Sequence, residues 1–130
     1  MRHRRRSVLI ANGNRTIAQE YRQRLEQAGL CVFVASDGDQ ACILAARQRF
    51  ELIITNLDLP ILSGAEFCRH VREDLQLIDV PIAVCVAAGR EGDAADLTVD
   101  CSIARIFHQP IDIDSLVEFA KETSGSLVTA

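Results

Sequence analysis

Continuous apolar runs alternate along this chain with segments whose apolar residues recur every three or four positions. Continuous runs are typical of strands buried on both faces, and the wider spacing is typical of helices that bury one face. The runs predict five strands, at 7–12, 30–35, 51–56, 81–86 and 104–108. The periodic segments predict helices over 15–28, near 41–48, near 67–75 and near 113–120. Residues 87–100 are weakly patterned, and we expect a short additional helix there.

Strand and helix therefore alternate along the chain, which predicts an α/β fold with helices on both faces of a parallel sheet. Crossovers between parallel strands are right-handed by default, so we expect an open, doubly wound sheet of five strands. Ligand and catalytic sites of such sheets lie at the carboxyl ends of the strands. The residues that follow the predicted strands are Asn12, Gly13, Asn56, Val86 and Gln109.

Length and composition indicate one cytoplasmic domain. The 130 residues suffice for a single hydrophobic core, and every apolar run is far shorter than the ~20 residues of a membrane span. No signal peptide is expected, and no histidine or cysteine spacing suggests a metal site. The five cysteines lack a C-x-x-C pair, so we interpret them as small apolar residues in a reducing compartment. They are Cys31, Cys42, Cys68, Cys85 and Cys101.

The charge is unevenly distributed. Four of the 14 basic residues lie in the first six positions, which leaves 10 basic against 18 acidic residues in the remainder. We therefore divide the chain into a basic tail (1–6), a folded domain (7–123) and a C-terminal tail or linker (124–130). The acidic domain disfavours nucleic acid as a partner, except for weak binding through the tail. The arginines of that tail are Arg2, Arg4, Arg5 and Arg6.

Three stretches resemble the receiver domain of bacterial two-component response regulators. They are LEQAGLCVFVASDGDQAC (25–42), ELIITNLDLPILSGAEFCRHVR (51–72) and FHQPID (107–112). Pro60 and Gly64 stand where the family's phosphorylation loop has them. The resemblance covers the chain from position 7 to about 123. It implies a flavodoxin-like sheet of strand order 2-1-3-4-5 with about five helices.

The resemblance also implies five chemical groups, and all five depart from the family's pattern. The acidic pair that helps to hold Mg²⁺ falls on Asn12 and Gly13, and the phosphoryl-accepting aspartate falls on Asn56. The hydroxyl residue falls on Val86, and the lysine falls on Gln109. We therefore expect a degenerate receiver without phosphoryl transfer to Asn56, without a metal and without a cofactor. Gln109 avoids the uncompensated charge that a partly buried lysine without acids would carry, and its side chain can hydrogen-bond to Asn12 or Asn56.

Two further positions bear on this expectation. Asp58 lies two residues beyond Asn56, and it is either a substitute acceptor or cation ligand, or a solvated loop carboxylate. A single carboxylate makes a weak site for a hard cation, which favours the solvated carboxylate. The aromatic residue that switches in active receivers falls on Ile106, so this relay lacks both its aromatic group and the hydroxyl group of position 86.

We therefore expect a signalling module that works without phosphorylation, is not an enzyme and binds protein partners. The resemblance places the contact face at about 92–121, and homodimerisation through it stays open. One alternative is an unusual receiver that is phosphorylated or regulated through Asp58. Another is a flavodoxin-like domain that binds a small ligand, with NGNRT (12–16) beside a helix N-terminus as its phosphate loop.

Overall fold

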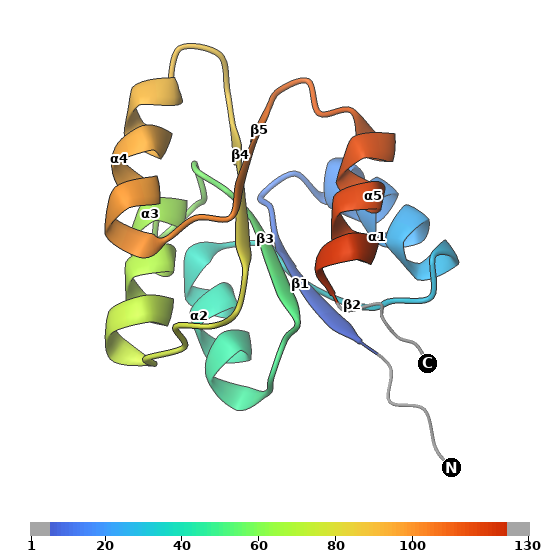
Figure 1. The fold of residues 1–130 in the computed structure, drawn as a ribbon, viewed down its shortest axis with the longest axis horizontal. Coiled ribbons are helices and arrows are strands. Elements are labelled where there is room, and N and C mark those ends of the chain that lie inside the picture. Colours follow the sequence, from blue (N-terminus) through green and yellow to red (C-terminus); the bar gives the residue numbers. More distant parts are fainter. Residues whose placement is uncertain (1–5, 125–130) are drawn as a thin grey trace.

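The computed structural model describes residues 6–124, which form one sheet flanked by helices (Figure 1). The strands are β1 (Ser7–Ala11), β2 (Cys31–Ala35), β3 (Leu52–Asn56), β4 (Ile82–Val86) and β5 (Arg105–His108). The helices are α1 (Arg15–Gln27), α2 (Gly38–Arg47), α3 (Gly64–Arg69), α4 (Glu91–Cys101) and α5 (Ile113–Thr123), with a π-helical turn, η1 (His70–Asp74), after α3. The two predicted tails lie outside the described residues, apart from Arg6 and Ser124.

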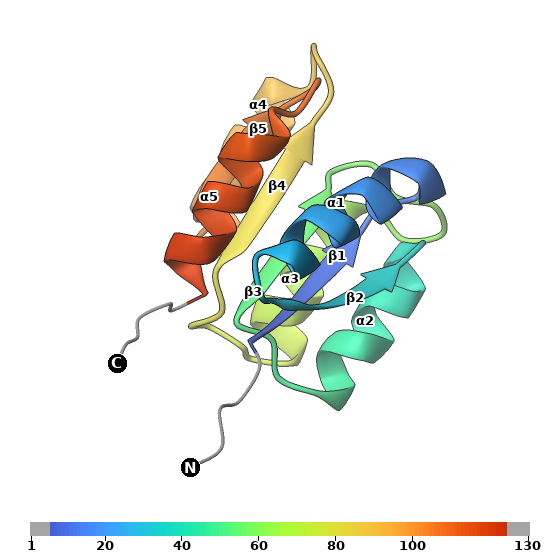
Figure 2. The ribbon, with the colours of Figure 1, turned by 90° about the vertical axis from the view of Figure 1, so that its right-hand side faces the viewer.

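All neighbouring strands of the sheet pair in parallel, in the order β2-β1-β3-β4-β5. The expected doubly wound fold and its strand order are confirmed. Figure 2 shows the arrowheads of β1, β2 and β4 at the same end of the sheet. The loops that follow these strands therefore gather at one edge, where the sequence places its candidate site.

The core lies in two layers, one on each face of the sheet. Helices α2, α3 and α4 cover one face, and α1 and α5 cover the other (Figure 1). Successive residues of one strand serve opposite layers, since Leu9 packs with the first group and Val8 and Ile10 pack with the second. Strands sandwiched in this way need apolar residues on both faces, which explains the continuous apolar runs of the sequence.

Local signals define the helix ends. Asn14 caps α1 by accepting the backbone N–H of Ile17, and Ser63 forms a capping box with Glu66 at the start of α3. Gly29 follows α1 at φ +95°, a left-handed conformation that favours glycine. The caps of α1 and α3 mark where the loops after β1 and β3 end at the carboxyl edge, whereas Gly29 lies at the opposite edge, before β2.

Two helices differ from the simple periodic pattern. The predicted third helix is divided into α3 and the π-helical turn η1, in which the N–H of Leu75 donates to the carbonyl of His70. The weakly patterned stretch holds an 11-residue helix, α4. No helix within residues 6–124 is long and apolar enough to cross a bilayer.

Candidate functional site

The residues expected at the site lie at the carboxyl edge of the sheet. Asn12 directly follows β1, and its N–H donates to the carbonyl of Ala35 at the end of β2, at 3.0 Å. Asn56 ends β3 and Val86 ends β4. Gln109 directly follows β5. The parallel sheet thus brings together positions that are far apart in the sequence.

Two amide side chains meet at the centre of this edge. The Nδ2 of Asn12 donates to the Oδ1 of Asn56 at 3.4 Å, and the Oδ1 of Asn12 accepts the backbone N–H of Asn14 at 2.8 Å. Asn12 is only 3% exposed. Its polar atoms therefore bond within the protein, and the pair that they form carries no charge.

The wall beside this pair is apolar. Val86 is completely buried, and its carbonyl accepts the backbone N–H of Gln109 at 2.8 Å. Cys85, which stands opposite Asn56 in the strand ladder, is also buried. Burial raises the pKa of the Cys85 thiol to about 12, so the sulfur next to the site is a neutral thiol and not a thiolate nucleophile.

The side-chain hydrogen bond suggested for Gln109 is not found among residues 6–124. Among the described residues 6–124, its side chain has no hydrogen bond to Asn12 or Asn56, and Gln109 is exposed to solvent. The backbone bond to Val86 extends the β5 ladder by one residue, and the Nδ2 of Asn12 already donates to Asn56. Gln109 precedes Pro110 across a cis peptide bond.

Close packing against backbone explains Gly64, and packing against a proline side chain favours glycine at position 13. A Cβ atom on Gly64 would lie 1.9 Å from the carbonyl oxygen of Asn56, and the N–H of Gly64 donates to Leu57 at 2.8 Å. A Cβ atom on Gly13 would lie 3.0 Å from the Cδ of Pro60. The turn after β3 is therefore packed against both its own strand and the loop after β1.

Asp58 forms an ion pair with an arginine from the neighbouring loop. Nη1 of Arg90 lies 2.8 and 3.0 Å from the two carboxylate oxygens of Asp58, and its Nε donates to Asp93 at 2.7 Å. These bonds, first that to Asp93 and then that to Asp58, raise the pKa of Arg90 above its ordinary value. Asp58 is exposed, so its carboxylate is both solvated and neutralised by a cation.

Histidine, cysteine and carboxylate side chains do not cluster in this part of the molecule. Within residues 6–124, no group of three or more such side chains is placed to hold a metal ion. The amide pair, the valine wall and the Asp58–Arg90 pair together offer no set of converging carboxylates for a hard cation.

Comparison with known proteins matches a family model, the response regulator receiver domain, to residues 8–121. The chain belongs to the response regulator receiver domain family. Receiver domains are modules of two-component signalling that interact with protein partners. The match spans nearly the whole described part of the chain.

Individual relatives agree with this assignment. The polar-differentiation response regulator DivK of Brucella anthropi is 27% identical over 120 residues, which cover 92% of this receiver domain and 97% of DivK. The response regulator receiver protein Anae109_2439 of an Anaeromyxobacter strain is 31% identical over 112 residues, 78% of this chain. The match spans only 45% of that relative's own length.

A solved structure shows the same fold. The chemotaxis response regulator CheY4 of Vibrio cholerae superposes with a TM-score of 0.81 at 23% identity, over 92% of this chain and 99% of the other. In this receiver domain, Ile106 lies on β5 opposite Val84 and packs against the core layer that includes α4. The position expected to correspond to the family's switching aromatic thus holds a partly buried aliphatic residue.

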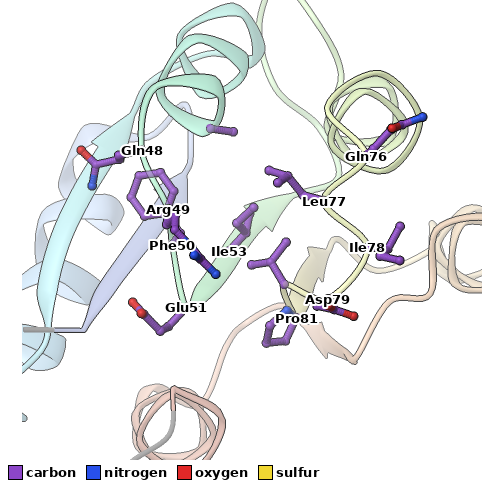
Figure 3. Close-up of a pocket in the computed structure, with 12 residues that line it drawn as sticks. Gln48, Arg49, Phe50, Glu51, Ile53, Gln76, Leu77, Ile78, Asp79 and Pro81 are labelled. Carbon is purple, nitrogen blue, oxygen red and sulfur yellow. The ribbon is translucent and has the colours of Figure 1, made fainter.

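A cavity that the sequence did not reveal lies at the opposite edge of the sheet. It measures about 320 Å³ and is formed where the chain enters β3 and β4. Figure 3 shows Phe50 and Ile53 on one side of it and Leu77 and Ile78 on the other. These residues read as ordinary apolar positions in the sequence, because only the fold brings the two segments together.

Proposed function

We propose that this receiver domain signals without accepting a phosphoryl group on Asn56 and without a tight Mg²⁺ site. The observation that carries the proposal is the amide pair of Asn12 and Asn56 at the carboxyl edge of the sheet. An amide nitrogen is a poor nucleophile toward phosphorus, and an amide oxygen carries no formal charge. Phosphoryl transfer depends on positioning and on charge stabilisation, and this edge supplies little charge.

The surroundings of the pair support the same proposal. Mg²⁺ dehydrates reluctantly and is normally held through one or two carboxylates. Asn12 and Gly13 supply none, and Val86 presents methyl groups where a hydroxyl would contact a phosphoryl oxygen. Asp58 is the nearest acid along the chain to Asn56, and it is paired with Arg90. A cation at Asp58 would therefore have to compete with Arg90 for the carboxylate oxygens.

The test is incubation of the purified chain with acetyl phosphate and Mg²⁺, followed by intact-mass measurement. We expect the wild type to gain no phosphoryl adduct. An adduct on the wild type that disappears in Asp58→Ala would refute the proposal and identify Asp58 as the acceptor. Arg90→Ala is the matched variant, since it frees the Asp58 carboxylate. An adduct in Arg90→Ala alone would show that the ion pair, rather than the missing acids, protects Asp58.

We further propose that residues 92–121 form the partner-binding face and that the partner is basic. This segment contains six acidic and two basic residues, a balance of −4. Arginines outside the segment pair with three of these acids, Asp93, Asp100 and Asp114, so the acids left to meet a basic partner are Asp96, Asp112 and Glu118. A symmetric homodimer through this face would bring like charges together, whereas a basic surface would complement them. The strongly exposed Val99 of α4 adds an apolar contact within this acidic face.

Charge reversal tests this face. Glu118→Lys changes an exposed residue of α5, and Glu20→Lys is the matched control on α1, outside the face. Binding partners recovered with the wild type and with Glu20→Lys, but lost with Glu118→Lys, would support the proposal. Equal recovery with both variants would contradict it.

A further inference from the structure

Ile61 occupies a conformation that isoleucine rarely adopts. Its φ is +71°, and the N–H of Leu62 donates across it to the carbonyl of Pro60 at 2.7 Å. A bond from residue i+2 to residue i around a positive central φ defines the strained form of the γ-turn. A β-branched residue at positive φ is a genuine outlier, because its Cβ crowds the backbone.

Burial of the Ile61 side chain does little to offset this backbone strain. Ile61 is 81% exposed, so most of its apolar surface remains in water. Backbone strain and an exposed large aliphatic group are both unfavourable, and neither is offset by packing within the described residues. Strain of this kind is concentrated at functional positions.

The turn is held rigidly from two sides. The carbonyl of Pro60 accepts a second bond, from the N–H of Gly38 at the start of α2, at 3.1 Å. A Cβ atom on Gly38 would lie 1.9 Å from the carbonyl oxygen of Leu62, so α2 contacts the turn directly. On another side, Pro60 packs against Gly13. The direction of the Ile61 side chain is therefore fixed before any partner arrives.

The turn is also free of charge. Residues 59–64 contain no ionisable side chain. The charged groups nearest in sequence are already engaged within the chain, since Asp58 is paired with Arg90 and Glu66 is bonded to Ser63 in the capping box. The start of α2, which contacts the turn, carries Asp37 as its N-cap and Asp39 in its first turn. The uncharged surface is therefore that of residues 59–64 themselves, which complements an apolar pocket better than a charged one.

We propose that Ile61 is a preorganised anchor that inserts into an uncharged apolar pocket of a partner protein. Aliphatic or aromatic anchors of this kind contribute most of their binding energy when they enter a well-packed pocket. Because the backbone is already fixed, little conformational entropy is lost on docking. This surface lies on the β3–α3 turn, outside the face at 92–121, and it does not depend on whether the domain accepts a phosphoryl group.

The experiment places the photoreactive residue benzoylphenylalanine at position 61 in the full chain in cells, and at position 43 as the control. Ile43 is also an exposed isoleucine, but it lies in regular helical backbone on α2. The protein crosslinked specifically through position 61 is then purified and titrated with the wild type and with Ile61→Gly, Ile61→Asn and Ile43→Ala. Glycine and asparagine both tolerate positive φ, so these variants keep the turn while removing the anchor.

We expect Ile61→Gly and Ile61→Asn to raise the Kd of that partner by about tenfold or more, and Ile43→Ala to change it by less than about twofold. Retained thermal stability in both position-61 variants would show that the loss is not caused by misfolding. The proposal is overturned if position 61 yields no specific adduct, or if the purified partner binds Ile61→Gly as tightly as the wild type. An adduct between two copies of this chain would also overturn it, in favour of self-association.

Discussion

Replacing Ile61 by glycine should stabilise the protein, although the substitution removes a large apolar side chain. Residues held at sparsely populated backbone angles cost about 1–3 kcal/mol, and glycine at φ +71° carries no such cost. Against this gain, glycine lowers stability by about 0.5–1 kcal/mol through the entropy of the unfolded chain.

The packing energy lost with the isoleucine side chain is small, because Ile61 is 81% exposed. Full burial of an isoleucine contributes about 1.5–3 kcal/mol, so the buried fifth of its surface contributes about half a kcal/mol. With a strain of about 2 kcal/mol, the net effect is a stabilisation of roughly 0.5–1 kcal/mol. This corresponds to a rise in Tm of about 2–4 °C for a domain of this size.

Ile43→Gly is the matched comparison, because α2 has ordinary helical backbone and Ile43 is 45% exposed. Loss of helix propensity and of the buried half of the side chain should destabilise this variant by about 2 kcal/mol. Urea unfolding of both variants measures the difference and its sign. A loss of more than about 1 kcal/mol in Ile61→Gly would show that the turn is not strained, and that Ile61 is kept for internal packing.

Three further outcomes are expected. Gly64→Ala should lower the free energy of unfolding by about 3 kcal/mol in urea titrations, since its Cβ would lie 1.9 Å from a backbone oxygen of Asn56. Asn12→Ala should cost about 1–3 kcal/mol in the same assay, because it removes a buried amide that accepts the N–H of Asn14 and donates to Asn56. Burial raises the pKa of Cys85 to about 12, so the folded state favours the protonated thiol. The stability that the buried thiol contributes is therefore complete below about pH 9 and is lost as the pH rises toward 12. Stability measured from pH 8 to 11 should therefore fall less steeply in Cys85→Ala than in the wild type.

The fold could be predicted from the sequence because each strand is a continuous apolar run and most helices show a clear apolar stripe. The π-helical turn η1 could not be predicted in this way. The stripe Phe67, Val71 and Leu75 has a spacing of four residues, which drifts around an ideal α-helix of 3.6 residues per turn. The wider turn at His70–Asp74 lets Val71 and Leu75 keep their contacts with the same core layer.

The positions of the site residues could be predicted, but their contacts could not. The parallel sheet alone places Asn12 near Asn56, because their strands are neighbours. The Asp58–Arg90 pair joins residues that are 32 positions apart and lie in two loops, so no periodic pattern marks it. The φ of Ile61 is likewise invisible in the sequence, since isoleucine gives no signal for a left-handed turn.

At this edge of the sheet a charged side chain would be costly at position 12 but not at position 109, because Gln109 is exposed to solvent. A lysine at position 109 would keep most of its hydration, so the missing acids alone do not explain why an amide stands there. Asn12 differs, because it is 3% exposed and bonded to a neutral amide. An ionised carboxylate at this position would lose its hydration, and the donors that face it are the N–H of Asn14 and the Nδ2 of Asn56 once that amide turns over. On the proposed function, the electrostatic basis for the lack of a tight cation site therefore lies chiefly in the buried amide at position 12, together with its partner at position 56.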